Sequence, residues 1–158
     1  MVKTLAAALT ALLLAGCGFT PVYSDVSSST GPIAVETIPG RSGHILRREL
    51  LRDLKAGLPG VDESAVLTVT LDESLSQLAF SPDGAASRSS VRASAQYVLA
   101  LSDNAVSGTI NSTANFNVPD NPYGDISAQQ AAYERAMLDL ARLMVDDLRI
   151  KLTAIEGQ

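Results

Sequence analysis

The only cysteine of the chain, Cys17, ends a short apolar N-terminal segment and follows Leu14, Ala15 and Gly16. A leucine, two small residues and a cysteine form a lipobox, the pattern of a bacterial lipoprotein signal. The small residues allow the segment to enter a narrow peptidase groove, and the thiol is the nucleophile that receives a diacylglyceryl group. After cleavage, we expect Cys17 to become the first residue, acylated on sulfur and on its new amine.

The residues before the cysteine agree with an export signal. Lys3 is a positive n-region, and Leu5–Leu14 is an uncharged run of Leu, Ala and Thr. This run has roughly half of the ~20 residues that a spanning helix needs, so we expect cleavage rather than a retained anchor. Acylation contributes about 0.8 kcal/mol per buried CH₂, so two or three chains hold a protein on a membrane. The alternative is an ordinary signal peptide with a chance cysteine near its cleavage site.

Other reactive chemistry lacks the residues it needs. His44 is the only histidine, so neither a Ser-His-Asp triad nor a His-rich metal site can be built in the usual way. Acylation consumes the thiol of Cys17. Asp146 and Asp147 are neighbours on a predicted helix and project in different directions, which does not suit a carboxylate pair. We therefore predict a non-enzymatic protein without catalytic residues, metal or cofactor.

Composition limits the compartment and the partners. The chain of 158 residues carries a net charge of −5, so it has no general attraction for nucleic acid or anionic lipid. We expect no nucleic-acid partner, and any phosphate contact must come from a local patch. A single cysteine excludes an intrachain disulfide. We divide the chain into a signal peptide at 1–16, a lipidated tether at 17–32 and one domain at 33–158. Within the tether, Phe19–Tyr23 could pack on the domain or lie at the membrane surface.

Hydrophobic periodicity predicts the elements of the domain. In chain order they are a strand at 33–38, a helix at 41–57, a strand at 67–80, two strands at 91–101 and 106–118, and a helix at 126–155. We expect a bulge or bend at Asp72–Ser74, a turn at Ser81–Gly84 and a mobile segment at Ala85–Ser90. This order predicts an α+β two-layer sandwich, with about four strands in a mixed or antiparallel sheet and two helices on one face.

Polar residues mark where the helices begin and end. Ser42 is the candidate N-cap of the first helix, and Gly57 suits the position just after its end. Ser127 and Gln130 fit a capping box at the start of the second helix.

The last two strands give the strongest tertiary signal. A turn centred on Asp103 and Asn104 would pair Leu101 with Val106 and Leu99 with Gly108, which brings the apolar residues of both strands to one face. The opposite face then carries an unbroken polar ladder, which consists of Ser107, Thr109, Asn111, Thr113, Asn115 and Asn117. That face is either exposed to water or covered by something polar.

Four segments together resemble a known family, the LPS-assembly lipoproteins, in their alphaproteobacterial form. These segments are Gly16–Tyr23, Val91–Tyr97, Asn115–Tyr123 and Glu134–Met137. This family is the E component (LptE) of the lipopolysaccharide transport machinery. With the element order, the resemblance covers nearly the whole mature chain.

The resemblance implies a location, a partner and a ligand. Members are held in the outer membrane on its periplasmic side, plug the lumen of a large β-barrel translocon (the D component, LptD), assist its assembly and bind lipopolysaccharide. No catalytic residues are known for them. Gly18 is not the aspartate that retains many lipoproteins in the inner membrane, which is compatible with outer-membrane sorting. A barrel interior is polar, so the polar ladder is a candidate lumen contact, and exposure to water is the alternative.

Two groups of cations could meet anionic ligands. One enriches the first helix and consists of Arg41, Arg47, Arg48, Arg52 and Lys55. The other, Arg88 and Arg92, flanks the expected mobile segment. Guanidinium groups bind phosphates bidentately, so Arg88 and Arg92 are candidate lipopolysaccharide contacts, with a solvated charged surface as the alternative.

The leading hypothesis is an outer-membrane lipoprotein that plugs the lipopolysaccharide-exporting barrel and assists its assembly by binding. A second is a lipoprotein subunit of an ABC-type lipid or solute transporter, which can share an α+β build and a lipobox. A third, a periplasmic hydrolase, is disfavoured by the residue inventory.

Overall fold

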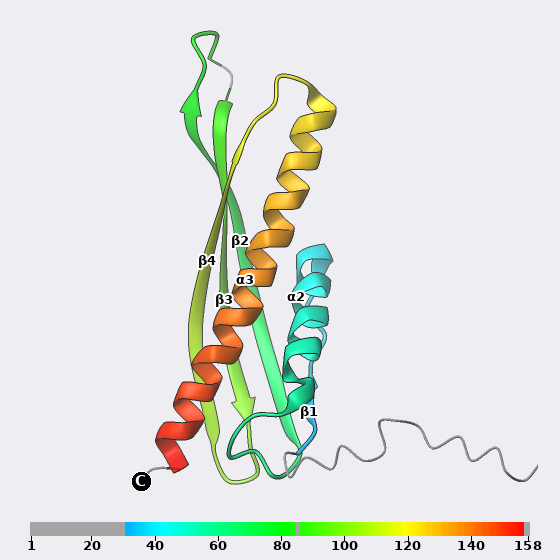
Figure 1. Ribbon diagram of the computed structural model, residues 1–158, viewed down its shortest axis with the longest axis vertical. Helices are drawn as coiled ribbons and strands as arrows, with labels where there is room; N and C mark the ends of the chain where they lie inside the picture. Colours follow the sequence, from blue (N-terminus) through cyan, green and yellow to red (C-terminus); the bar gives the residue numbers. More distant parts are fainter. Residues whose placement is uncertain (1–30, 85, 157–158) are drawn as a thin grey trace, which may run out of the picture.

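The computed structural model describes residues 31–84 and 86–156. Cys17, the lipobox and most of the expected tether therefore lie outside the described residues. Figure 1 shows an elongated molecule in which two helices cover one face of a twisted sheet. The elements are β1 (Ile33–Val35), α2 (Gly40–Asp53), the 3₁₀ turn η1 (Leu54–Ala56), β2 (Ala65–Phe80), β3 (Ala86–Ala100), β4 (Ala105–Asn117) and α3 (Pro122–Glu156). The expected α+β sandwich is confirmed.

The sheet is mixed, with strand order β1-β2-β3-β4. β1 runs parallel to the start of β2, while β2, β3 and β4 form an antiparallel meander. Gly31 and Pro32, at the end of the expected tether, already hydrogen-bond to Val61 and Ala65 through their backbones.

The first helix begins earlier than its sequence suggested. Gly40, with a φ of 81°, turns the chain into α2 and adopts a conformation that costs glycine little. Pro39 occupies the N-cap position without a side-chain hydrogen bond, and Ser42 is buried in the first turn, so the prediction of Ser42 as N-cap is wrong. The end is as expected: Gly57, with a φ of 78°, follows η1.

β2 continues straight through the position where a bend was expected. Asp72, Glu73 and Ser74 pair in unbroken register with β3, so that expectation is wrong, and the irregular pairing lies at Gln77–Phe80 instead. All three residues are exposed. The alternation of polarity fades there because neither side of this stretch enters the core.

The segment after the expected turn belongs to the sheet. Gly84 N donates to Ser81 O at 2.9 Å, which confirms the turn at Ser81–Gly84. Ala86–Ser90 forms the start of β3 between β2 and β4, so the expectation of a mobile segment is wrong for these residues. The segment is rich in serine, whose small side chains bury little apolar surface. Backbone pairing with β2, and with β4 from Arg88 on, holds it in the sheet.

The hairpin of β3 and β4 has the expected faces but a different register. Leu99 pairs with Val106, and Tyr97 pairs with Gly108, two residues away from the predicted pairs. Leu101 N donates to Asn104 O at 2.9 Å, so the turn is centred on residues 102 and 103. A shift of two residues preserves the alternation of side chains, which is why the predicted apolar and polar faces are correct.

The second helix starts at an asparagine cap. Asn121 Oδ1 accepts a hydrogen bond from Gly124 N at 2.6 Å, and Pro122 occupies the first helical position, where its missing N–H costs nothing. Ser127 lies inside α3 and donates to Tyr123 O at 3.0 Å, so the predicted capping box of Ser127 and Gln130 is wrong.

The core lies between the sheet and the two helices. Its largest fully buried side chains include Leu46 and Leu50 of α2, Leu67 of β2, Tyr97 and Leu99 of β3, and Met137, Leu140, Met144 and Leu148 of α3. Among the described residues, neither helix combines the length and the apolar character that crossing a bilayer requires.

Candidate binding surface

The outer face of the sheet, on the side away from the helices, is mostly polar across its three long strands, with Val66 and Val98 as exposed apolar residues. Each polar residue of the β4 ladder continues a row that crosses β3 and β2. One row joins Thr109, Gln96 and Thr70, and the next joins Asn111, Ser94 and Asp72. All six residues of the ladder are exposed, so the predicted polar face exists and presents hydroxyl and amide groups to its surroundings.

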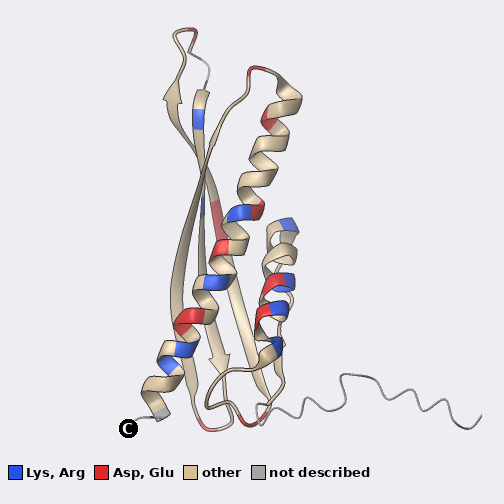
Figure 2. Ribbon diagram, in the orientation of Figure 1, with Lys and Arg blue, Asp and Glu red and all other residues tan. Residues whose placement is uncertain are grey.

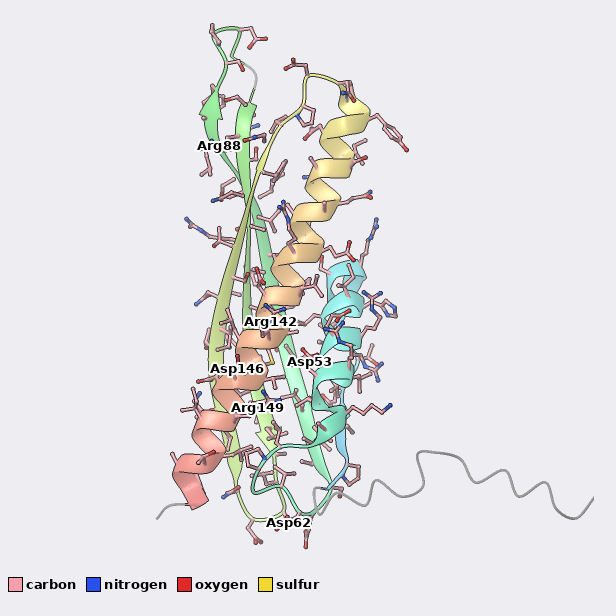
Figure 3. The ribbon with its side chains drawn as sticks, viewed as in Figure 1. Asp53, Asp62, Arg88, Arg142, Asp146 and Arg149 are labelled. Carbon is pink, nitrogen blue, oxygen red and sulfur yellow. The ribbon has the colours of Figure 1, made fainter. Side chains whose placement is uncertain are left out.

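Arg88 and Arg92 lie on the same strand but do not converge on one point. Arg88 pairs with Asn117 and Arg92 with Thr113, both on β4. Four residues of a strand separate their Cα atoms by about 13 Å. Figure 3 shows Arg88 near the upper end of β3. The two guanidinium groups could therefore meet two anionic groups of one extended ligand, or act separately.

A third cation, Arg135 of α3, lies beside Arg88. Both line a hollow of about 710 Å³ between α3 and the end of β4, together with Asn115, Asn117 and Glu134. Arg135 also donates from Nη2 to Asn115 O at 3.3 Å. Sequence reasoning missed Arg135 because nothing in the chain order links the middle of α3 to the end of β4.

The cations of α2 are engaged within the domain. Arg47 donates from Nε to Val35 O at 3.0 Å and so ties α2 to β1. Arg48 and Arg52 both pair with the buried carboxylate of Glu49, at 3.1 and 2.7 Å. These contacts give most of the first cation group a structural role, which leaves Arg88 and Arg92 as the better candidates for a ligand. Figure 2 shows how the charges gather on the two helices and leave β4 uncharged.

A polar cluster joins α3 to the sheet at the border of the apolar layer, where Tyr97 is buried and the side chains of Asp147 and Lys151 are partly exposed. Tyr97 OH donates to Asp147 Oδ2, and Lys151 Nζ lies 2.8 Å from the same carboxylate. Lys151 Nζ also donates to Tyr97 OH at 3.0 Å and to Ser107 O at 2.8 Å. Sequence reasoning considered Asp147 only as part of an adjacent carboxylate pair. The spacing of four residues between Asp147 and Lys151 is the available signal, because residues four apart on a helix lie on the same face and can form an ion pair.

Burial and mutual contacts shift the pKa values of this cluster. Burial raises the pKa of Tyr97, and the hydrogen bond to Asp147 raises it further. Burial alone would raise the pKa of Asp147, but hydrogen bonds from Lys151 and Tyr97 bring it below 3.8. The hydrogen bond to Asp147 raises the pKa of Lys151. The cluster is thus held as an ion pair with a neutral phenol, which suits a structural junction between helix and sheet.

The remaining candidate residues show no grouping for catalysis. His44 is exposed on α2, as expected for a surface residue. Within residues 31–84 and 86–156, no three His, Cys, Asp or Glu side chains gather in a way that could hold a metal ion. Asp146 faces away from Asp147's partners and pairs with Arg149 at 3.3 Å.

Comparison with known proteins identifies a family and several similar folds. The sequence model of the family described as "LptE: Lipopolysaccharide-assembly" matches residues 30–148. No curated protein matches the chain. A solved structure of a putative lipoprotein from Caulobacter crescentus is 25% identical and has a TM-score of 0.59, over 77% of this chain and 90% of that one.

Two further solved structures share the fold at lower identity. The rare lipoprotein B from Shewanella oneidensis is 13% identical with a TM-score of 0.60, over 80% of this chain and 98% of that one. A minor lipoprotein from Acinetobacter baumannii is 14% identical with a TM-score of 0.56, over 76% of this chain and 93% of that one.

Proposed function

Because the chain belongs to the LptE family of non-enzymatic lipopolysaccharide-assembly lipoproteins, we propose that it acts in the outer membrane as the plug of a lipopolysaccharide-exporting β-barrel of the LptD type. In this proposal the acylated Cys17 holds the domain on the periplasmic side of the membrane. The domain then enters the barrel lumen and assists assembly of the barrel by binding, without chemistry of its own.

The outer face of the sheet is the observation that best supports this proposal. A large barrel has a polar interior, so a domain inserted there needs hydroxyl and amide groups that can exchange water for lumen side chains. The row through Thr109 supplies these groups over three strands, and the row through Asn111 supplies them on β4 and β3 and ends at Asp72 on β2. Charged side chains would be costly to desolvate in a lumen, and β4 carries none.

Isolation of the native lipidated protein from membranes tests the plug. We expect a large outer-membrane barrel to co-purify with it, and Cys17→Ser to lose both the acyl chains and most of the recovered barrel. Mass spectrometry of the mature N-terminus should find acylated Cys17. Recovery of soluble periplasmic proteins or inner-membrane transporter subunits alone would contradict the plug, and an unmodified thiol or an uncleaved leader would contradict the lipid attachment.

We also propose that Arg88 and Arg92 contact the anionic groups of lipopolysaccharide. Both are exposed on β3, and Arg135 adds a third guanidinium beside Arg88. The double variant Arg88→Glu/Arg92→Glu should weaken lipopolysaccharide binding at least tenfold, because it replaces attraction by repulsion. Arg142→Glu, on the exposed side of α3, is the matched control. Unchanged affinity of the double variant removes these residues from the ligand contact.

A further inference from the structure

β4 forms a free edge of the sheet. Among the described residues it pairs only with β3. At the two ends of the hairpin, Leu101 N donates to Asn104 O and Val118 N donates to Ser87 O. In this register, the even-numbered residues of β4 direct their backbone N–H and C=O groups toward β3. In an antiparallel pair the intervening residues direct both backbone groups away from the partner strand. Thr109, Asn111 and Thr113 therefore point their N–H and C=O groups out of the sheet.

Side chains of α3 close this edge at both ends but leave its middle open. Lys151 donates to Ser107 O at 2.8 Å, and Arg135 donates to Asn115 O at 3.3 Å. Between them, no hydrogen bond from the described part of the chain reaches the outward groups of residues 109–113. A short stretch of regular strand thus presents unpaired donors and acceptors in alternation.

β4 also lacks the features that usually protect an edge strand. Ala105–Asn117 contains no charged residue and no proline, and its pairing with β3 shows no bulge. Figure 2 shows this strand without charge along its whole length. The opposite free edge, β2 beyond Leu67, carries Asp72 and Glu73 and has irregular pairing at Gln77–Phe80. Of the two edges, only β4 is suited to accept another strand.

α3 provides an apolar surface next to this edge. Asp147 and Lys151 touch the sheet, and Leu143 and Ile150 lie four residues before and three residues after Asp147, on the same side of the helix. Leu143 is 47% exposed and Ile150 is 69% exposed. Side chains of an added strand that point toward the helix layer could bury these two residues.

We propose that β4, between Ser107 and Asn115, binds an extended segment of a partner protein as a fifth strand of the sheet. An extended backbone is the complement of alternating outward N–H and C=O groups. The segment would place apolar side chains toward Leu143 and Ile150 and polar ones on the outer face. The proposal concerns the edge, not the outer face, and holds whichever protein supplies the segment.

A second copy of this chain fits the edge less well than a different partner. Antiparallel pairing of two β4 strands about Asn111 would set Ser107 of one copy opposite Asn115 of the other. Lys151 of one copy would then lie close to Arg135 of the other, and like charges across an interface oppose association.

Proline in place of Asn111, whose backbone groups point out of the sheet, provides the test. Asn111→Pro removes an outward N–H but leaves the bonds of Ile110 and Ser112 to β3, so the fold should tolerate it. The full lipidated chain is isolated from native membranes with its bound proteins. Glu73→Pro, at the opposite free edge on β2 and outside the polar ladder, is the matched control. We expect Asn111→Pro to retain at least tenfold less partner and Glu73→Pro to stay within twofold. Thr109→Lys is a second blocking variant if the proline lowers the melting temperature.

Amide hydrogen exchange separates strand addition from other contacts. In the purified protein, the amides of Thr109, Asn111 and Thr113 should exchange fast, while those of Ile110 and Ser112 exchange slowly. In the native complex all five should be slow.

Several outcomes would overturn the proposal. One is full retention of partner by both blocking variants, and another is fast exchange of the outward amides in native membranes. Slow exchange of these amides in the purified monomer would instead assign the edge to the chain's own N-terminal segment. A purified dimer with protected outward amides would also overturn it. The identity of the retained protein tests the barrel partner independently.

Discussion

Gly108 controls how closely α3 approaches the sheet. It lies opposite Tyr97 in the hairpin, and a Cβ at this position would come within 2.5 Å of Lys151 Nζ and 2.6 Å of the Tyr97 hydroxyl. The missing side chain thus creates the space in which the phenol, Lys151 and Asp147 meet. A partly buried polar junction is most stable when every member has a partner, and here each one does.

Gly108→Ala should therefore destabilise the domain by about 1–3 kcal/mol, because the methyl group forces the Tyr97 ring and Lys151 to move. Thr109→Ala, one residue away and exposed, should change stability by less than about 0.5 kcal/mol. Urea denaturation followed by circular dichroism measures both. Equal effects of the two substitutions would show that the space above Gly108 is not needed.

The same junction makes stability depend on pH. The pKa of Asp147 is lowered below 3.8, so its ion pair adds stability above that pH and loses it as the pH falls through the folded value. The difference in unfolding free energy between wild type and Asp147→Asn should be constant from about pH 5 to 8 and should shrink below about pH 4. Asp146→Asn, whose side chain is 55% exposed, should show little of this trend. A difference that does not change with pH would contradict the role of the ion pair.

At the scale of elements, α3 is the part on which the others depend. It has 35 residues, which gives a length of about 52 Å. It contacts α2, β3 and β4. Its first turns extend beyond the N-terminal start of α2, as Figure 1 shows, so local capping matters more there than in the packed middle. Asn121 supplies that cap with its side-chain oxygen.

Asn121→Ala should cost about 1 kcal/mol, because it leaves the amide of Gly124 without its side-chain acceptor. Asn121→Asp should keep the cap. Ser127→Ala should be nearly neutral, since Ser127 donates to a carbonyl within the helix rather than capping it. Thermal denaturation of the three variants tests whether Asn121 or Ser127 caps α3. A larger loss of stability from Ser127→Ala than from Asn121→Ala would favour the capping box of Ser127 and Gln130.

At the scale of the whole molecule, one helix serves the core on one side and borders the free β4 edge on another. Leu140 is fully buried in the core, whereas Leu143, three residues later, is half exposed beside that edge. The core side of α3 and the side that borders the proposed docking edge are therefore distinct. The polar outer face, the β4 edge and the β2 edge beyond Leu67 are surfaces of the sheet that no described element covers.

This separation predicts opposite results for two leucines. Leu140→Ala should lower the unfolding free energy by about 2–5 kcal/mol through cavity formation. Leu143→Ala should lower it by less than about 1 kcal/mol but reduce the amount of partner retained from native membranes. Denaturation and co-purification measure the two effects. Loss of stability without loss of partner for Leu143→Ala would contradict its place beside the docking edge.

The sequence by itself determined the element order, the two faces of the hairpin and the α+β class. These features follow from periods of two and 3.6 residues, which are local. Only the tertiary structure decided the pairing of Tyr97 with Gly108, since a shift of two residues leaves the alternation unchanged. The crossing of α3 over β4 decided that Lys151 meets Tyr97, that Arg135 joins Arg88 and that the middle of β4 stays open. These contacts join residues far apart in the chain, so no local pattern encodes them.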